Sequence, residues 1–98
     1  MNIRLSYIER NAFKKTFANF SGKVFMFGSR TDMKKKGGDI DVLLMPNDSQ
    51  EPIALKKTLT QRFQQEIEQS IDIVIYDAKK VFCREVLKYA QPIDPSLL

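Results

Sequence analysis

The chain has 98 residues, of which 43% are hydrophobic and 29% are charged, and its formal net charge is +4. The length predicts one domain over residues 1–98, and the composition excludes a disordered chain. With no His and only one Cys, the usual zinc sites and an internal disulfide are also excluded.

No apolar run approaches the roughly 20 residues that a membrane-spanning helix needs. The first 15 residues mix charged and apolar side chains, which does not fit a signal peptide. We therefore expect a cytoplasmic protein without a membrane partner.

The first half of the chain predicts a helix, a strand and a basic loop. Apolar residues at mostly helical spacing indicate an amphipathic helix over residues 3–19, which Ser21-Gly22 ends. The wholly apolar residues 24–27 indicate a buried strand that leads into a Gly28-Ser29 turn. Residues 30–38 are polar and basic, and Lys34, Lys35 and Lys36 there are either a solvated loop or a clamp for a triphosphate.

The second half alternates strands and helices, which predicts an α/β (α+β) fold. Strands are expected over residues 39–45 and 70–76, and a helix over residues 52–69 with Pro52 in its first turn. Asp77 is expected to cap a last helix over residues 78–90, and the tail from residue 91 to 95 is expected to be irregular. The apolar contacts of that last helix would come from Val81, Phe82, Val86, Leu87 and Tyr89, and we expect Cys83 to be a passive core or boundary residue.

Three aspartates stand in apolar runs that are typical of strands: Asp39, Asp41 and Asp72. An unpaired carboxylate there would be costly, and side chains two apart on a strand point to the same side. If the strand of Asp72 pairs beside that of Asp41, three hard oxygen ligands converge, which suits Mg²⁺ or Mn²⁺. The alternatives are solubilising charges at a strand end for Asp39 and Asp41, and an ion pair with a nearby Lys or Arg for Asp72.

These residues carry a resemblance to a known family. Phe27-Gly28-Ser29-Arg30, an eight-residue spacer, Asp39-Ile40-Asp41-Val42-Leu43 and then Asp72-Ile73-Val74-Ile75 resemble the minimal nucleotidyltransferases of the DNA polymerase beta superfamily, related in their core to kanamycin nucleotidyltransferase. Each piece alone is weak, but their order on the expected elements is specific. The resemblance implies the nucleotidyltransferase fold, with a small mixed sheet whose three strands are adjacent in order.

The resemblance also implies roles for the residues of the motif. Asp39 and Asp41 would hold two Mg²⁺ ions, while Asp72 would complete one metal's shell and help to deprotonate the acceptor. Gly28 and Ser29 would approach the phosphates of the nucleotide, and Arg30 or the lysines would neutralise the leaving pyrophosphate. Two cations about 3.5–4 Å apart can stabilise the attacking and the leaving oxygen of an in-line displacement. Ser29 as a simple turn residue is the alternative to its binding role.

The leading functional hypothesis is transfer of AMP from ATP to a partner protein. Short members of this family lack the domain that binds the acceptor, so the resemblance implies a separate helical protein of the HEPN type, an RNA-cleaving toxin with this chain as its antitoxin. A second hypothesis is an antitoxin that masks the toxin by binding and catalyses nothing. A third is transfer to RNA or to a small molecule such as an aminoglycoside.

Overall fold

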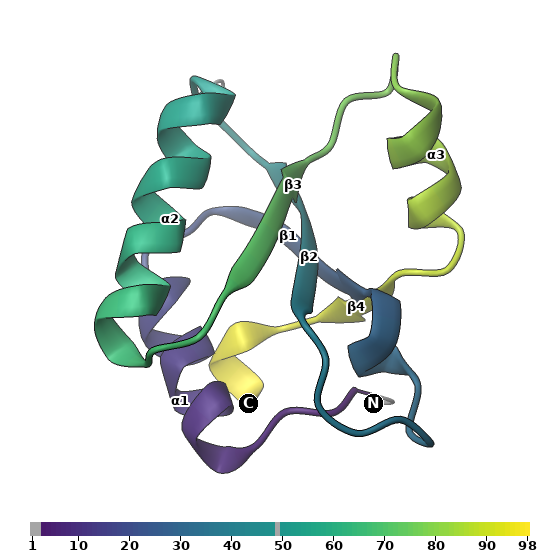
Figure 1. Ribbon diagram of the computed structural model, residues 1–98. Coiled ribbons are helices and arrows are strands. Elements are labelled where there is room, and N and C mark those ends of the chain that lie inside the picture. The colour runs from purple at the N-terminus through teal and green to yellow at the C-terminus, as the bar shows by residue number, and fades with distance from the viewer. Residues whose placement is uncertain (1–2, 49) are drawn as a thin grey trace.

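The computed structural model describes residues 3–48 and 50–98, and it contains three α-helices around a four-stranded sheet (Figure 1). Two short 3₁₀ helices, η1 and η2, complete it. In chain order the elements are α1 (Tyr7–Thr16), β1 (Gly22–Phe27), η1 (Gly28–Thr31), β2 (Ile40–Pro46), α2 (Pro52–Glu66), β3 (Ile71–Ile75), α3 (Val81–Leu87), β4 (Gln91–Ile93) and η2 (Pro95–Leu97).

The sheet is mixed, with the strand order β3-β2-β1-β4. β2 and β3 run parallel, and α2 forms the crossover that such a pair needs, whereas β1 is antiparallel to both β2 and β4. The predicted α+β class, the mixed sheet and the adjacent order of β1, β2 and β3 are confirmed.

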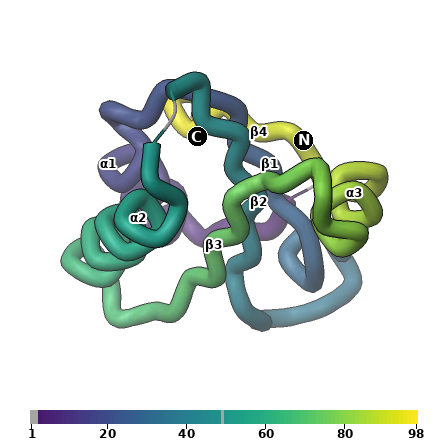
Figure 2. The backbone as a smooth tube through the Cα atoms, turned by 90° about the horizontal axis from the view of Figure 1, so that it is seen from above, coloured from purple at the N-terminus to yellow at the C-terminus, as the bar shows by residue number. Residues whose placement is uncertain are grey.

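The main core lies between the sheet and the helices α1 and α2, which cover one of its faces (Figures 1 and 2). Phe13 of α1 and Phe63 of α2 are fully buried and meet edge-on, with ring centroids 5.8 Å apart. Alternate residues of the strands complete this core: Val24, Met26, Ile40, Val42, Leu44, Ile71 and Ile73. The residues between them, including Asp41 and Asp72, therefore face the other side of the sheet.

The helix α3 lies on that other side (Figure 2). It spans only seven residues, and of these Cys83 is the buried one, as expected for a core residue. The prediction of a longer helix over residues 78–90 is wrong, and so is the prediction that Asp77 caps it. Asp77 instead accepts a hydrogen bond from the N–H of Lys79 in the preceding turn, because its short side chain satisfies the backbone there before the helix begins.

The predicted apolar contacts of α3 are also partly wrong. Val81, Phe82 and Tyr89 are 63%, 56% and 73% exposed. A helix of two turns can bury only a narrow stripe, so Val81 and Phe82, which lie off the line of Cys83, stay in solvent, and Tyr89 follows the end of the helix. We call these three residues the α3 patch. Phe82 still touches β1 at one edge, since its ring lies 6.2 Å from that of Phe27.

Other differences lie at the ends of elements. α1 begins at Tyr7 because Ser6 and Glu9 form a reciprocal capping box, which stops the helix short of residue 3. The tail predicted to be irregular forms β4, which pairs with β1 and places Pro92 on the outer edge of the sheet, where its missing N–H does no harm. No helix among the described residues combines the length and the apolar character needed to span a bilayer.

Candidate active site

Two of the three predicted carboxylates are direct neighbours in the sheet. Asp41 and Asp72 are register partners in the parallel pair of β2 and β3, so their side chains leave the same face side by side. Asp41 is also the register partner of Phe27, the last residue of β1, which places it next to the Gly28-Ser29 turn. Asp39 lies just before β2 begins and is exposed.

The charges of the two neighbouring carboxylates act on Asp41. Burial raises the pKa of Asp41, and the negative charges of Asp72 and then Asp39 raise this pKa further. A raised carboxyl pKa means that the folded protein disfavours the charged form. A bound cation would relieve this repulsion, so the site has the electrostatic character of a cation site.

The donor set fits Mg²⁺ or Mn²⁺, because carboxylate oxygens are the hard ligands that these ions prefer. In residues 3–48 and 50–98, however, no three side chains of Asp, Glu, His or Cys are close enough together to hold one ion. Mg²⁺ is commonly held by one or two carboxylates together with substrate phosphates, so the Asp41–Asp72 pair is a sufficient protein contribution. The shared two-ion site expected from the sequence stays a prediction.

Gly28 brings the turn against Asp41. Its φ is +78°, in the region that favours glycine, and a Cβ on it would lie 2.5 Å from Asp41 Oδ2. The following residue, Ser29, is the second residue of η1, and its Oγ lies so close to Gly38 that a Cβ there would collide with it. The turn and the loop before β2 therefore meet beside the carboxylate of Asp41.

Arg30 is turned into the protein. Its Nη1 and Nη2 donate to the two carboxylate oxygens of Glu9 at 2.8 and 2.7 Å, and the side chains of both residues are at least nine-tenths buried. Its Nε donates to Gly38 O at 3.0 Å, and Nη1 also donates to Arg4 O at 2.9 Å. This geometry favours a supporting role for Arg30, in contrast to the phosphate contact expected from the sequence.

Sequence reasoning missed Glu9 and Arg4 as members of this site. The pattern Ser6-x-x-Glu9 is typical of a helix N-terminus, and this local pattern predicts the capping role of Glu9. The pairing of Glu9 with Arg30 spans 21 residues, and no local pattern reports it. Lys34, Lys35 and Lys36 are exposed on the loop, and none of them takes part in an ion pair within the described part of the chain.

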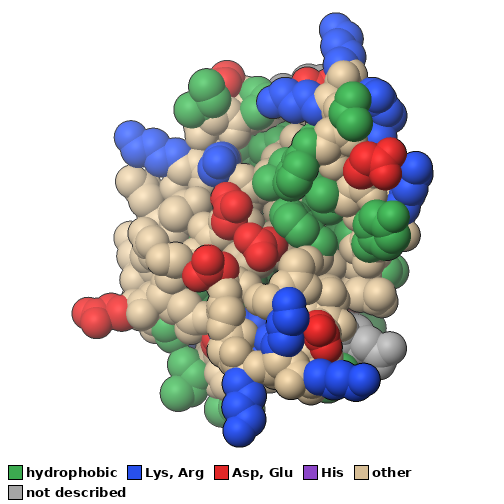
Figure 3. Space-filling model, turned by 45° about the vertical axis from the view of Figure 1, so that its right-hand side comes forward, with side chains coloured by type: hydrophobic (Ala, Val, Ile, Leu, Met, Phe, Trp, Pro, Cys, Tyr) green, Lys and Arg blue, Asp and Glu red, His purple; other side chains and the backbone are tan. Residues whose placement is uncertain are grey.

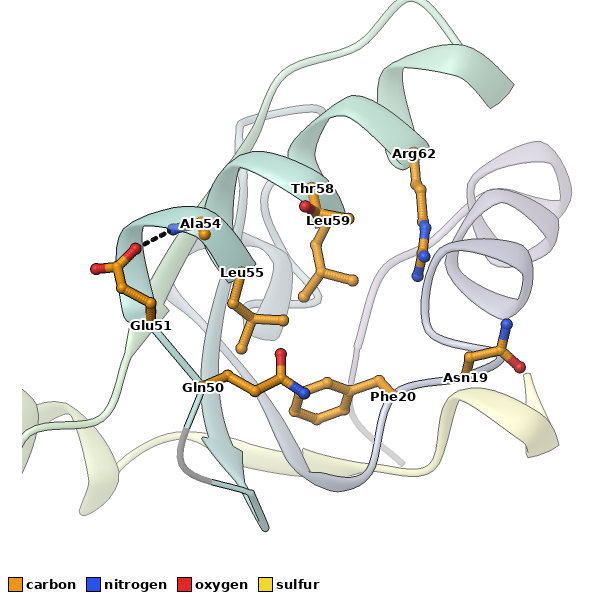
Figure 4. Close-up of a pocket in the computed structure, with 9 residues that line it drawn as sticks. All are labelled: Asn19, Phe20, Gln50, Glu51, Ala54, Leu55, Thr58, Leu59 and Arg62. Atoms are coloured by element: carbon orange, nitrogen blue, oxygen red, sulfur yellow. Dashed lines mark hydrogen bonds between the residues drawn. The ribbon is translucent and has the colours of Figure 1, made fainter.

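Acidic side chains gather near the centre of the molecular face in Figure 3, and hydrophobic side chains gather beside them over the α3 side. The pocket drawn in Figure 4 is elsewhere, between α2 and the end of α1, where Arg62 and Phe20 contribute to its wall. None of the three aspartates lines it. Its volume of about 260 Å³ is also below the range of roughly 300–1,000 Å³ typical of ligand pockets, so we do not place a nucleotide there.

Comparison with known families matches residues 11–93 to the family described as "Polymerase beta, Nucleotidyltransferase". No curated protein and no solved structure matches the chain. The matched residues include the Gly28-Ser29 turn and all three aspartates, and they cover well over half of the chain. The chain belongs to the polymerase beta nucleotidyltransferase family.

Proposed function

We propose that this chain is a magnesium-dependent nucleotidyltransferase that transfers AMP from ATP to a hydroxyl group of a separate protein. The observation that carries the proposal is the register pairing of Asp41 with Asp72 beside a turn that only glycine allows at position 28. Family membership supports nucleotidyl transfer in general. Beyond this general activity, we propose that ATP is the nucleotide, that a protein is the acceptor and that the chain acts in a toxin–antitoxin pair.

The chemistry assigns a task to each group. The acceptor oxygen forms a bond to the α-phosphorus of ATP, the bond from that phosphorus to pyrophosphate breaks, and pyrophosphate leaves. Asp72, which is exposed at this edge, is our candidate to take the hydroxyl proton. The backbone N–H groups of the Gly28-Ser29 turn would orient the phosphates. Mg²⁺ held by Asp41 and Asp72 together with the phosphates of ATP would supply charge stabilisation to the attacking and leaving oxygens.

The α3 patch supports a protein as the acceptor. Val81 and Phe82 are exposed on α3, which lies on the side of the sheet that carries the carboxylates (Figure 2), and Tyr89 is exposed two residues after that helix. Large exposed apolar side chains near one element of a small protein favour a protein–protein contact. A helical toxin of the HEPN type, modified on a hydroxyl group such as that of a tyrosine, is the partner that we propose.

Two other functions remain open to test. The α3 patch equally favours an antitoxin that masks its toxin by contact alone. The exposed Lys34, Lys35 and Lys36 favour an RNA acceptor, since Lys and Arg side chains neutralise the phosphates of a nucleic-acid backbone. Transfer to a small molecule has no such feature in its favour.

The test is incubation of the chain with ATP, Mg²⁺ and a co-expressed or candidate partner protein, followed by intact-mass analysis of the partner. We expect a gain of one AMP per modified hydroxyl, and the same reactions with CTP, GTP and UTP report base preference. Absence of the adduct, together with no pyrophosphate release on RNA or small-molecule hydroxyls, would remove the enzymatic proposal.

Replacing Asp39 and Asp41 together with Asn separates catalysis from masking. Amides weaken metal binding but leave the molecular surface nearly unchanged, so we expect loss of AMP transfer. Asp48→Asn is the matched control, because Asp48 is an exposed aspartate in the turn after β2. Neutralisation of a toxin that survives the double substitution would favour masking.

A further inference from the structure

The segment before α1 is joined to η1 through its backbone. The N–H of Arg4 donates to Arg30 O at 2.7 Å, and the Arg30 side chain returns a hydrogen bond to Arg4 O at 2.9 Å. Arg4 is therefore held in place by the residue that follows the Gly28-Ser29 turn.

The guanidinium of Arg4 ties together three backbone carbonyls of the loop between β1 and β2. Its Nη2 donates to Ser29 O at 2.8 Å and to Gly37 O at 2.9 Å, and its Nε donates to Asp32 O at 2.7 Å. These carbonyls belong to both ends of the loop. Hydrogen bonds from a charged donor are stronger than neutral ones, so this one side chain sets how the ends of the loop lie relative to each other.

A second set of hydrogen bonds, made by Arg30 and Glu9, also holds this loop. Arg30 donates to Gly38 O and pairs with Glu9, and Glu9 also accepts a hydrogen bond from Gln69 Nε2, just before β3. The network thus links α1, the loop and the approach to Asp72. It pairs carbonyl oxygens, which would repel a phosphate, with arginine donors.

We propose that Arg4 is a positioning residue for the nucleotide: it shapes residues 28–38 so that the turn presents N–H groups, and not carbonyl oxygens, to the phosphates. The inference rests on the proposed function, because it concerns binding of a nucleoside triphosphate at that site. It also extends the site beyond the family match, since Arg4 and Glu9 both precede residue 11.

Arg4→Gln tests this inference, with Arg10→Gln as the matched control. Both substitutions remove one positive charge near the start of α1, but the Arg10 side chain bonds only to Leu5 O among the hydrogen bonds of the described residues. We expect Arg4→Gln to raise KM and the Kd for ATP with Mg²⁺ roughly 10- to 100-fold and to change kcat much less, because the loop is misplaced while the carboxylates stay. Arg10→Gln should leave both constants within about twofold.

Arg4→Lys separates positioning from charge. Lysine keeps the charge but is a single point donor that cannot bridge three carbonyls, so we expect ATP affinity between those of wild type and Arg4→Gln. The Kd is measured by equilibrium binding well below the unfolding temperature of each variant. A merely structural role would lower the unfolding temperature of the variants without changing the Kd.

The outcomes are distinct. Wild type that binds no nucleotide contradicts the proposed function itself. Wild type that binds ATP, with folded Arg4→Gln binding equally well, overturns the role of Arg4 and leaves the proposed function intact. If Arg4→Gln does not fold, Arg4→Lys decides: weaker ATP binding than wild type supports the role, and equal binding overturns it.

Discussion

At the scale of single residues, Gly28 and Asp41 constrain each other. Gly28 adopts a backbone conformation that L side chains rarely adopt, and the space where its Cβ would stand is taken by the carboxylate of Asp41. A residue with a side chain at position 28 must therefore displace either the turn or the carboxylate.

Gly28→Ala compared with Gly37→Ala measures this constraint. Both glycines have positive φ, at +78° and +62°, but nothing lies within 4 Å of a Cβ at Gly37. We expect Gly37→Ala to cost about 1–2 kcal/mol from backbone strain alone, and Gly28→Ala to cost more and to lose Mg²⁺-dependent stabilisation. Urea unfolding with and without Mg²⁺ checks both; equal costs and an equal Mg²⁺ response would contradict the role of the contact.

The ionised carboxylate of Asp41 is expected to destabilise the folded state when no cation is bound. Burial and the charges of Asp72 and Asp39 raise its pKa, so its ionisation destabilises the folded state at neutral pH. Asp41→Asn should therefore raise Tm in EDTA by a few °C, since about 1 kcal/mol corresponds to 4–8 °C in a domain of this size. The same variant should lose the Tm increase that Mg²⁺ gives wild type. A lower Tm in EDTA would contradict this electrostatic account.

At the scale of elements, the Glu9–Arg30 pair joins α1 to η1. Burial alone would raise the pKa of Glu9, but hydrogen bonds from Arg30, the Ser6 N–H and Gln69, with the positive charge of Arg30, lower it from 4.5 to about 2. Because the folded-state pKa is the lower one, the pair contributes its full stability above pH 4.5. That contribution is lost as the pH falls toward 2.

Glu9→Gln is expected to destabilise the protein by about 3–5 kcal/mol at pH 7, because it leaves Arg30 buried without its counterion. The difference in unfolding free energy between wild type and variant should shrink between pH 4.5 and 2. Lys15–Glu66 offers the matched control, since it is a more exposed ion pair: Glu66→Gln should cost no more than about 1 kcal/mol. A pH-independent difference for Glu9→Gln would contradict the assigned pKa.

At the scale of the whole molecule, the two faces of the sheet differ in how they are covered. α1 and α2 close one face over a continuous core, whereas α3 covers the face that carries the carboxylates much less completely (Figures 1 and 2). The first face supplies stability, and the second leaves the candidate site and the α3 patch open to solvent.

Substitutions of two phenylalanines, one on each side of the sheet, test this difference in covering. Phe63→Ala removes a fully buried ring and should cost about 3–5 kcal/mol. Phe82→Ala removes a ring that is 56% exposed, so we expect a cost below about 1.5 kcal/mol and, if the patch binds a partner, weaker complex formation. Urea unfolding gives both costs, and similar values would contradict the unequal covering of the two faces.

Much of this fold follows from local patterns in the sequence. The apolar stripes that contain Phe13 and Phe63 predict α1 and α2, and the alternation of apolar residues with Asp41 and Asp72 predicts β2 and β3. Helical and strand periodicity depend on residues only a few positions apart. β4 could not be predicted in this way, since the three-residue segment becomes a strand only when β1 lies beside it. The length of α3 and the exposure of Phe82 likewise depend on what packs against them.

The order of the elements from α1 to α3, the turn at Gly28 and the strand positions of Asp41 and Asp72 follow from the amino-acid sequence, because each depends on short-range spacing and residue chemistry. The inward direction of the Arg30 guanidinium toward Glu9, and the hydrogen bonds by which Arg4 joins the two ends of the loop, were visible only in the folded chain. Those contacts link residues 21 to 33 positions apart, and which buried charge meets which donor depends on how the helices and the sheet pack.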